Sequence, residues 1–310
     1  MNPAGGTELQ YEFLKKYVSK DILDEFQICL SVPGRVPLSA NKINILWQKM
    51  APDQPHFQKF FKDKEQIKQY DYYVFNSNWN HEQFRKAFDI PLHKCSVIKN
   101  GIPEIKLRDP DKKREKIKLI YHPTPWRGLS VLLGAMQLVK NPNIELDVYS
   151  STKVYGSDFE KDNDNQYKEL YDQARALPNV NYIGYKSNQY ILDNLHTYDA
   201  FVYPNIWEET FCISALEALA CGLYVATTNN GALYETCSEF PIYVPYDNDL
   251  RNLATQFAAV IDGIPEQINE KGLQIHLKFQ QKFYNHFYNW KSIGGQWTNF
   301  LKGAINARPK

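Results

Sequence analysis

The chain has 310 residues, of which 43% are hydrophobic, so it is long enough to bury two separate cores. Its 36 basic and 35 acidic side chains give a formal net charge of +1, which leaves no overall field to attract nucleic acid or anionic lipid. The five cysteines form no C-x-x-C pair, which suits a reducing compartment. The sequence has no signal-peptide pattern and no apolar run near the roughly 20 residues of a membrane span, so we predict a cytoplasmic protein. Peripheral contact with a membrane surface stays open.

In the first hundred residues, short β-branched or aromatic runs predict strands of a parallel sheet. These runs cover residues 26–32, 43–47, 70–76 and 96–99. The following stretch, residues 108–116, is charged, poor in apolar residues and interrupted by Pro110, as linkers are. We therefore predict an N-terminal domain over residues 1–107.

From about residue 116, strand-like runs alternate with longer amphipathic runs, the pattern of repeated βα units. Predicted strands cover residues 116–122, 144–150, 180–185, 199–204, 223–228 and 241–246. Predicted helices cover residues 129–140, 165–177, 188–198, 213–221 and 249–261. This order predicts one doubly wound, parallel-sheet domain over residues 108–284. The aromatic-rich remainder, residues 285–310, predicts a helix that packs back on the N-terminal domain.

The most informative segment is residues 204–222. Its pattern predicts the end of a strand, a loop with Glu208 and Glu209, and a helix followed by Gly222 as its C′ residue. We expect the helix to begin near Thr210, so that backbone N–H groups at the carboxyl edge of the sheet can bind a diphosphate. The expected donor contacts are Thr210, Phe211 and Cys212.

Glu209 and Glu217 lie eight residues apart in this context, and the sequence here resembles glycosyltransferase family 4, with its Glu-x7-Glu signature. Residues 217–222 are similar to the family's Glu-Ala-x-Ala-x-Gly run, and residues 231–235 to its Gly-rich turn. The resemblance implies an α/β, GT-B fold: two Rossmann-like doubly wound parallel-sheet domains that face each other across a cleft. It further implies a retaining, metal-independent transferase without a cofactor, whose donor is a UDP- or GDP-sugar. Glu209 would then orient the sugar as a catalytic residue, and Glu217 would bind the ribose.

The loop after residue 121 extends the resemblance. Arg127-Gly128 is similar to the family's basic residue and glycine, which neutralise donor phosphate, and we assign Arg127 a catalytic role. Thr124 stands where the family has a first basic residue, and Tyr185 is a further expected donor contact. Gly5 and Gly6 resemble the family's glycine loop for acceptor or phosphate.

Two further motifs, Ser77-Asn78-Trp79 and Asn100-Gly101-Ile102, also resemble the family and are expected to be structural. The chain opens at the glycine loop, so we expect a small N-terminal domain that lacks the family's first strand. Gln48 stands where the family commonly has a histidine, and no catalytic histidine is assigned.

Other features argue against a metal or a nucleic-acid partner. The run Asp162-Asn163-Asp164 is similar to a metal-binding Asp-x-Asp, but its polar surroundings predict a solvated loop. No His/Cys cluster has zinc spacing, and the aromatic residues interleave with no basic stripe.

Three functions therefore compete. The first is transfer from a nucleotide-sugar to a carbohydrate or glycolipid acceptor. The second is different chemistry on the same fold, such as that of a nucleotide-sugar epimerase or a phosphorylase. The third is a catalytically silent nucleotide-sugar-binding protein.

Overall fold

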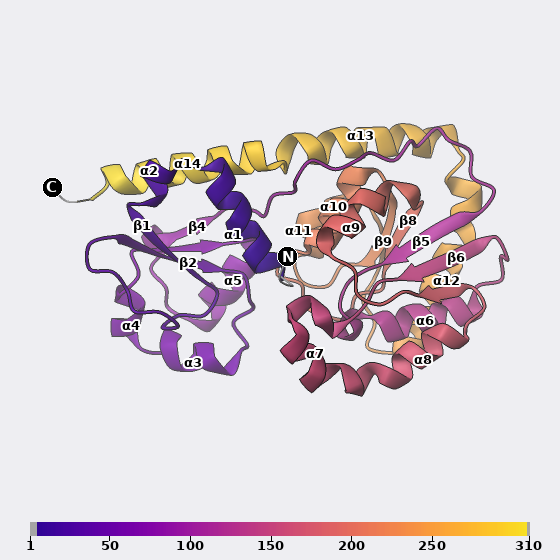
Figure 1. Cartoon of the computed structure of the whole chain (residues 1–310), viewed down its shortest axis with the longest axis horizontal. Coiled ribbons are helices and arrows are strands. Elements are labelled where there is room, and N and C mark those ends of the chain that lie inside the picture. Colours follow the sequence, from indigo (N-terminus) through magenta and orange to yellow (C-terminus); the bar gives the residue numbers. More distant parts are fainter. Residues whose placement is uncertain (1–4, 309–310) are drawn as a thin grey trace. The chain divides into compact units, whose positions relative to one another are not determined.

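The computed structural model describes residues 5–308, apart from the side chain of His56, and these residues form two compact units. The N-terminal unit contains Gly6–Pro103, Glu208–Phe211 and residues 287–308 (Figure 1). The C-terminal unit contains Gly5, Glu104–Trp207 and Cys212–His286. Four residues in the middle of the C-terminal sequence, Glu208–Phe211, therefore belong to the N-terminal unit.

The N-terminal unit is built on a parallel sheet with the strand order β1-β2-β3-β4. The strands are β1 (Phe26–Leu30), β2 (Ile43–Gln48), β3 (Tyr72–Phe75) and β4 (Cys95–Val97). The helices are α1 (Gly6–Tyr17), α2 (Lys20–Leu23), α3 (Pro55–Phe61), α4 (Lys64–Lys68), α5 (Asn78–Ala87), η1 (Leu92–Lys94) and α14 (Trp290–Asn306). All four predicted strands and their parallel arrangement are confirmed.

Strand β2 is buried along its whole length because both faces of this sheet are covered. Successive side chains alternate between the faces: Trp47 packs in a core with Trp290 and Trp297 of α14, whereas Leu46 packs in a core with Phe84 of α5. The rings of Trp47 and Trp297 lie 4.7 Å apart. The C-terminal helix thus completes the core of the N-terminal unit, as its aromatic content predicts.

The C-terminal unit has a six-stranded sheet with the order β10-β9-β8-β5-β6-β7, and all neighbouring strands are parallel. The strands are β5 (Ile117–Tyr121), β6 (Ile144–Val148), β7 (Val180–Tyr182), β8 (Ala200–Tyr203), β9 (Tyr224–Thr228) and β10 (Ile242–Val244). The order reverses between β5 and β8, which makes the carboxyl ends of these two strands a topological switch point. The predicted α/β class and the doubly wound sheet are confirmed.

Helices cover both faces of this sheet (Figure 1). They are η2 (Pro125–Arg127), α6 (Leu129–Leu138), η3 (Thr152–Tyr155), α7 (Ser157–Asn163), η4 (Asp164–Tyr167), α8 (Lys168–Ala176), α9 (Asn188–Asn194), η5 (Leu195–Thr197), α10 (Ile213–Cys221), α11 (Leu233–Cys237), α12 (Leu250–Gln267) and α13 (Lys271–Phe287). Helix α12 packs on α6, and α10 packs on β9 and α11.

The prediction of a loop at residues 162–164 was wrong, although Asp162 is exposed to solvent as predicted. Asp162 and Asn163 end α7, and Asp164 begins η4. The Asp164 carboxylate accepts hydrogen bonds from the hydroxyls of Thr152, at 2.8 Å, and Tyr171, at 2.9 Å. These tertiary partners fix a segment whose polar composition alone favours a loop.

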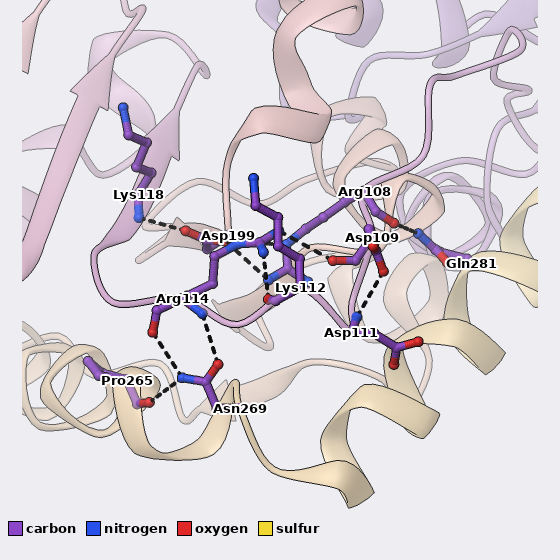
Figure 2. A network of polar contacts seen from close by, with 10 residues as sticks. All are labelled: Arg108, Asp109, Asp111, Lys112, Arg114, Lys118, Asp199, Pro265, Asn269 and Gln281. Atoms are coloured by element: carbon purple, nitrogen blue, oxygen red, sulfur yellow. Dashed lines mark hydrogen bonds and ion pairs between the residues drawn. The ribbon is translucent and has the colours of Figure 1, made fainter.

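A buried ion-pair network lies at the start of β8, where Asp199 precedes the strand (Figure 2). Its Oδ1 accepts from Nη2 of Arg108 at 3.0 Å and from Nε of Arg114 at 2.5 Å, and its Oδ2 accepts from the backbone N–H of Lys118 at 3.0 Å. The Arg108 side chain is fully buried. The network therefore anchors the charged stretch 108–116 to the amino edge of the sheet, although its composition is typical of a linker.

We expect Asp199→Asn to lower the free energy of unfolding by about 3–5 kcal/mol, because it leaves the buried Arg108 without a counter-charge. Urea denaturation measures the loss. Glu145→Gln is the matched control, since it removes the same charge from the exposed Lys118–Glu145 pair and should cost less than ~1 kcal/mol. Equal losses in the two variants would contradict the assigned importance of the network.

Candidate active site

The β5–α6 loop emerges at the switch point and carries two of the predicted site residues. Thr124 is buried, its Oγ1 accepts a hydrogen bond from Nε of Arg127 at 3.1 Å, and its carbonyl accepts one from the hydroxyl of Tyr121 at 3.1 Å. The structure thus brings Thr124 and Arg127 together in one loop, and the Thr124 hydroxyl orients the guanidinium.

Gly128 allows this loop to approach the end of β8. Its φ is +126°, and a Cβ built on it would lie 2.1 Å from the carbonyl oxygen of Pro204. The backbone N–H of Ile206 donates to the carbonyl of Arg127 at 3.3 Å, so the two loops are joined by backbone. No other residue type fits at position 128 without moving β8 or the loop.

We expect Gly128→Ala to destabilise the protein by more than ~3 kcal/mol, because backbone strain and a steric clash add. Gly156→Ala separates the two effects: its φ is +107° and its Cβ would meet nothing within 4 Å, so only strain of about 1–2 kcal/mol applies. Gly295→Ala, in the interior of α14 with open space, should instead stabilise by about 0.5–1 kcal/mol. Chemical denaturation of the three variants checks this order.

The β8–α10 loop holds the next site residues. At its start, the buried Asn205 accepts a hydrogen bond from the backbone N–H of Trp207 at 2.9 Å, and its own carbonyl accepts from the hydroxyl of Thr228 at 2.8 Å. Glu209 is buried, with 5% of its surface exposed. Phe211, buried as well, lies near the ring of Tyr288.

The structure confirms the helix predicted over residues 213–221, whereas the expected start near Thr210 was wrong because the preceding loop contains Thr210. The Thr210 hydroxyl donates to the carbonyl of Lys49 at 2.9 Å and accepts from the Asn76 amide at 3.2 Å. Its carbonyl accepts from the hydroxyl of Ser77 at 2.7 Å. Thr210 therefore holds the segment Glu208–Phe211 at the carboxyl ends of β2 and β3, so its hydroxyl is already engaged.

Helix α10 begins at Ile213, and Cys212 is its N-cap residue. Cys212 has φ +74° and ψ +85°, a left-handed conformation that costs about 1–3 kcal/mol in a residue other than glycine. The N–H groups of the first helical turn have no intrahelical acceptor and attract an anion at this end of the helix dipole. The helix N-terminus therefore lies three residues after Thr210, and Gly222 caps the C-terminus after Cys221, as predicted.

Glu217 lies in the middle of α10 and is almost completely buried, with 2% exposed. Burial raises the pKa of its carboxyl from 4.5 to about 7, and the amide of Asn188, which donates to Oε1 at 3.4 Å, opposes this only in part. Asn188 begins α9 directly after the loop that contains Tyr185. Glu217 therefore faces the β7–α9 connection at the carboxyl edge.

A raised carboxyl pKa makes stability depend on pH. Because the folded protein binds the Glu217 proton more tightly than the unfolded chain does, the contribution of Glu217 to the free energy of unfolding is highest below pH 4.5. That contribution falls as the pH rises through about 7, where the buried carboxyl loses its proton. We expect Glu217→Gln to match the wild type near pH 4.5 and to exceed its unfolding free energy at pH 8 by up to ~3 kcal/mol. Urea denaturation at several pH values measures this difference. A variant that stays less stable than the wild type at pH 8 would show that the carboxylate is not desolvated.

The other predicted residues lie at different places. Tyr185 is half-buried, with the ammonium of Lys153 6.0 Å from its ring centre. Gly5 is buried in the C-terminal unit, and Gly6 is exposed as the first residue of α1 in the N-terminal unit. Gly6 is thus helical, where a loop was expected.

A polar cluster in the N-terminal unit was missed by the sequence analysis. Lys49 follows β2, is buried, and donates from Nζ to Oδ1 of Asn100 at 2.5 Å, with Nζ 3.7 Å from the Trp47 ring centre. Burial holds the pKa of Lys49 well below its usual value. Gln10 exchanges two hydrogen bonds with the backbone of Gly101, at 2.7 and 3.0 Å. The Asn-Gly-Ile motif therefore supports Lys49, whose carbonyl accepts the hydrogen bond of Thr210. The sequence feature that could have indicated this cluster is a lysine directly after a buried strand.

Comparison with known proteins identifies the family. A family model described as glycosyl transferases group 1 matches residues 105–263, just over half of the chain. The chain belongs to this family. The lipopolysaccharide 1,2-N-acetylglucosaminetransferase of Salmonella typhimurium is 27% identical to it over 174 residues. That alignment covers 49% of this chain and 44% of the relative, so the match spans less than half of the relative's length.

Solved structures show the fold of this group 1 chain. A glycosyltransferase from Rickettsia africae has a TM-score of 0.68 at 17% identity, over 97% of this chain and 81% of that one. Sucrose-phosphate synthase from Thermosynechococcus elongatus has a TM-score of 0.69 at 15% identity, over 99% and 83%. HepE from Anabaena, crystallised with UDP-glucose, has a TM-score of 0.64 at 14% identity, over 86% and 73%. The predicted GT-B fold is confirmed: the group 1 chain has the two parallel sheets of GT-B glycosyltransferases.

Two further features bear on the site. A cavity of about 260 Å³ lies between α13 and the amino ends of β9 and β10, at the edge of the sheet opposite the switch point, and is thus remote from the predicted donor residues. Its lining includes Tyr224, Phe240, Ile242 and His276. Within residues 5–308, no three His, Cys, Asp or Glu residues are grouped as a metal site.

Proposed function

We propose that this glycosyltransferase moves a sugar from a UDP-sugar to a hydroxyl group of a saccharide or glycolipid, with retention of configuration and without a metal ion. The observation that carries the proposal is the switch point, where the Arg127 loop and the segment that leads into α10 leave adjacent strands. HepE was crystallised with UDP-glucose and the pneumococcal transferase GtfA with UDP and GlcNAc, which supports uridine in the donor. The Salmonella relative supports a saccharide acceptor.

In this proposal, the diphosphate lies at the N-terminus of α10. The N–H groups from Ile213 onwards and the guanidinium of Arg127 stabilise the negative charge that develops on the leaving group. Preorganised donors supply most of such catalysis because they need no reorganisation when the bond breaks. The strained Cys212 fits this role, since it sets the direction in which the helix terminus points.

Glu209 is separated from the start of α10 by three residues, Thr210, Phe211 and Cys212. We assign it to the sugar hydroxyls, since its segment is held by Thr210. Glu217, farther along α10 and beside Asn188, accepts hydrogen bonds from the ribose. Glu209 is not assigned as a nucleophile, because a carboxylate that holds sugar hydroxyls need not reach the anomeric carbon.

The direct test incubates the full chain with UDP- and GDP-sugars and a panel of saccharide and glycolipid acceptors. NMR of the product determines the anomeric configuration, and EDTA tests the need for a metal. Retention and unchanged turnover in EDTA support the proposal. Donor conversion without an acceptor would instead indicate an epimerase, and donor binding without turnover or hydrolysis a silent binding protein.

We expect UDP to raise the Tm far more than UMP, because in this proposal both the N-terminus of α10 and Arg127 bind the second phosphate, which UMP lacks. Arg127→Gln should remove most of the difference, a loss of about 1.5–3 kcal/mol of UDP binding energy. Lys140→Gln, an exposed lysine that follows α6, is the control and should bind UDP like the wild type. Equal Tm shifts from UDP and UMP in the wild-type protein would contradict the assigned phosphate site.

The two glutamates should separate kinetically. We expect Glu217→Gln to weaken donor binding by about 1.5–3 kcal/mol with a smaller effect on kcat, because it loses a charge-assisted hydrogen bond. Glu209→Gln should chiefly lower kcat, by roughly 100-fold, because its contacts align the sugar in the transition state. Calorimetry with UDP-sugar and steady-state kinetics distinguish these outcomes. Glu208→Gln makes the same change at the exposed neighbouring position and should leave both constants near wild type.

A further inference from the structure

Helix α13 is basic in a chain whose total charge is close to zero. It carries three lysines, Lys271, Lys278 and Lys282, together with two histidines and no acidic residue. After Glu270 the sequence contains no aspartate or glutamate at all, although the whole chain has 35 of them. The positive charge is therefore concentrated locally, which the net charge of +1 conceals.

The helix has a well-defined outward face. Its buried residues are Leu277, Gln280, Gln281 and Tyr284, which mark the side packed on the C-terminal unit. The helical period places a second set on the opposite side, all of them exposed: Lys271, Ile275, Lys278, Phe279, Lys282 and His286.

Two large apolar side chains stand among these cations. Ile275 and Phe279 lie one turn apart, and each is 59% exposed. Phe279 is therefore outside the core, unlike the buried tryptophans Trp290 and Trp297 of α14. Figure 1 shows α13 along the outside of the C-terminal unit.

The acidic groups beside this face are few. Lys278 pairs with Asp111 at 2.5 Å, and Glu239 lines the cavity beneath the helix. Within the described chain, Lys271 and Lys282 have no ion-pair partner. The face thus keeps positive charge on both sides of the Ile275–Phe279 pair.

We propose that the outward face of α13 binds the surface of an anionic lipid bilayer. Helices that lie in the interface combine lysines, which attract lipid phosphates, with a few apolar side chains that enter the acyl boundary. Because one side of α13 packs on the C-terminal unit, only its outward face is available to a membrane surface. No helix in residues 5–308 is long and apolar enough to cross a membrane. A second copy of the chain fits this face poorly, because a twofold interface would bring the same lysines together. This inference is independent of the proposed function.

The test measures partition of the full chain onto vesicles by sedimentation, with phosphatidylcholine alone and with phosphatidylcholine mixed with phosphatidylglycerol. We expect binding to the mixed vesicles that weakens with salt, and little binding to the neutral ones. K271Q/K282Q should lower the partition coefficient roughly 30-fold, because the loss of each basic side chain lowers it about fivefold. I275S/F279S should lower it roughly tenfold.

The controls change two lysines and one large apolar residue at exposed positions of the N-terminal unit. K59Q/K86Q and L92S should bind the mixed vesicles like the wild type. All substituted side chains are exposed, so thermal melts and the UDP-induced Tm shift should be unchanged. Equal binding to both kinds of vesicle, an equal loss in the controls, or a vesicle-free dimer that the α13 variants abolish would each overturn the proposal.

Discussion

The candidate site depends on one close approach, that of Gly128 to the carbonyl of Pro204. β5 and β8 are adjacent strands whose following helices cover different parts of the sheet, so their loops diverge unless something holds them together. The backbone at Gly128 does so because it presents no Cβ, and the hydrogen bond from Ile206 to Arg127 completes the junction. The guanidinium that we assign to donor phosphate is thereby placed beside the loop that leads to Glu209.

The two edges of the C-terminal sheet differ in whether a buried carboxylate is paired with a cation. At the amino edge, Asp199 is neutralised by Arg108 and Arg114, which favours stability once the network is intact. At the carboxyl edge, Glu217 is buried with only a weak amide contact, and Cys212 has a strained backbone. Backbone strain and unpaired buried charge lower the stability of the folded chain, and both are typical of active sites, where function is favoured over stability.

The sequence predicted every strand of both sheets because buried parallel strands are β-branched and aromatic runs bounded by turn residues. It also predicted that Thr124 and Arg127 share a loop, and that Gly222 caps the C-terminus of α10. The range predicted for α10, residues 213–221, was correct, but the expected start near Thr210 was not, because the hydrogen bonds of Thr210 with Lys49 and Ser77 join segments far apart in the chain. Lys49 was missed for the same reason: its place directly after a buried strand was a weak local signal, and its importance arises only when β2 and the Asn100 turn come together.

The membership of Glu208–Phe211 in the N-terminal unit has a consequence for expressing the protein in parts. A polypeptide of residues 104–286 would still contain Glu209, but the partners of Thr210 at Lys49, Asn76 and Ser77 would be on the missing piece. Nucleotide affinity would then survive separation better than turnover. Mixing the two pieces would restore activity to the extent that this four-residue segment recovers its hydrogen bonds, so fragment complementation would report on the ordering of Glu209.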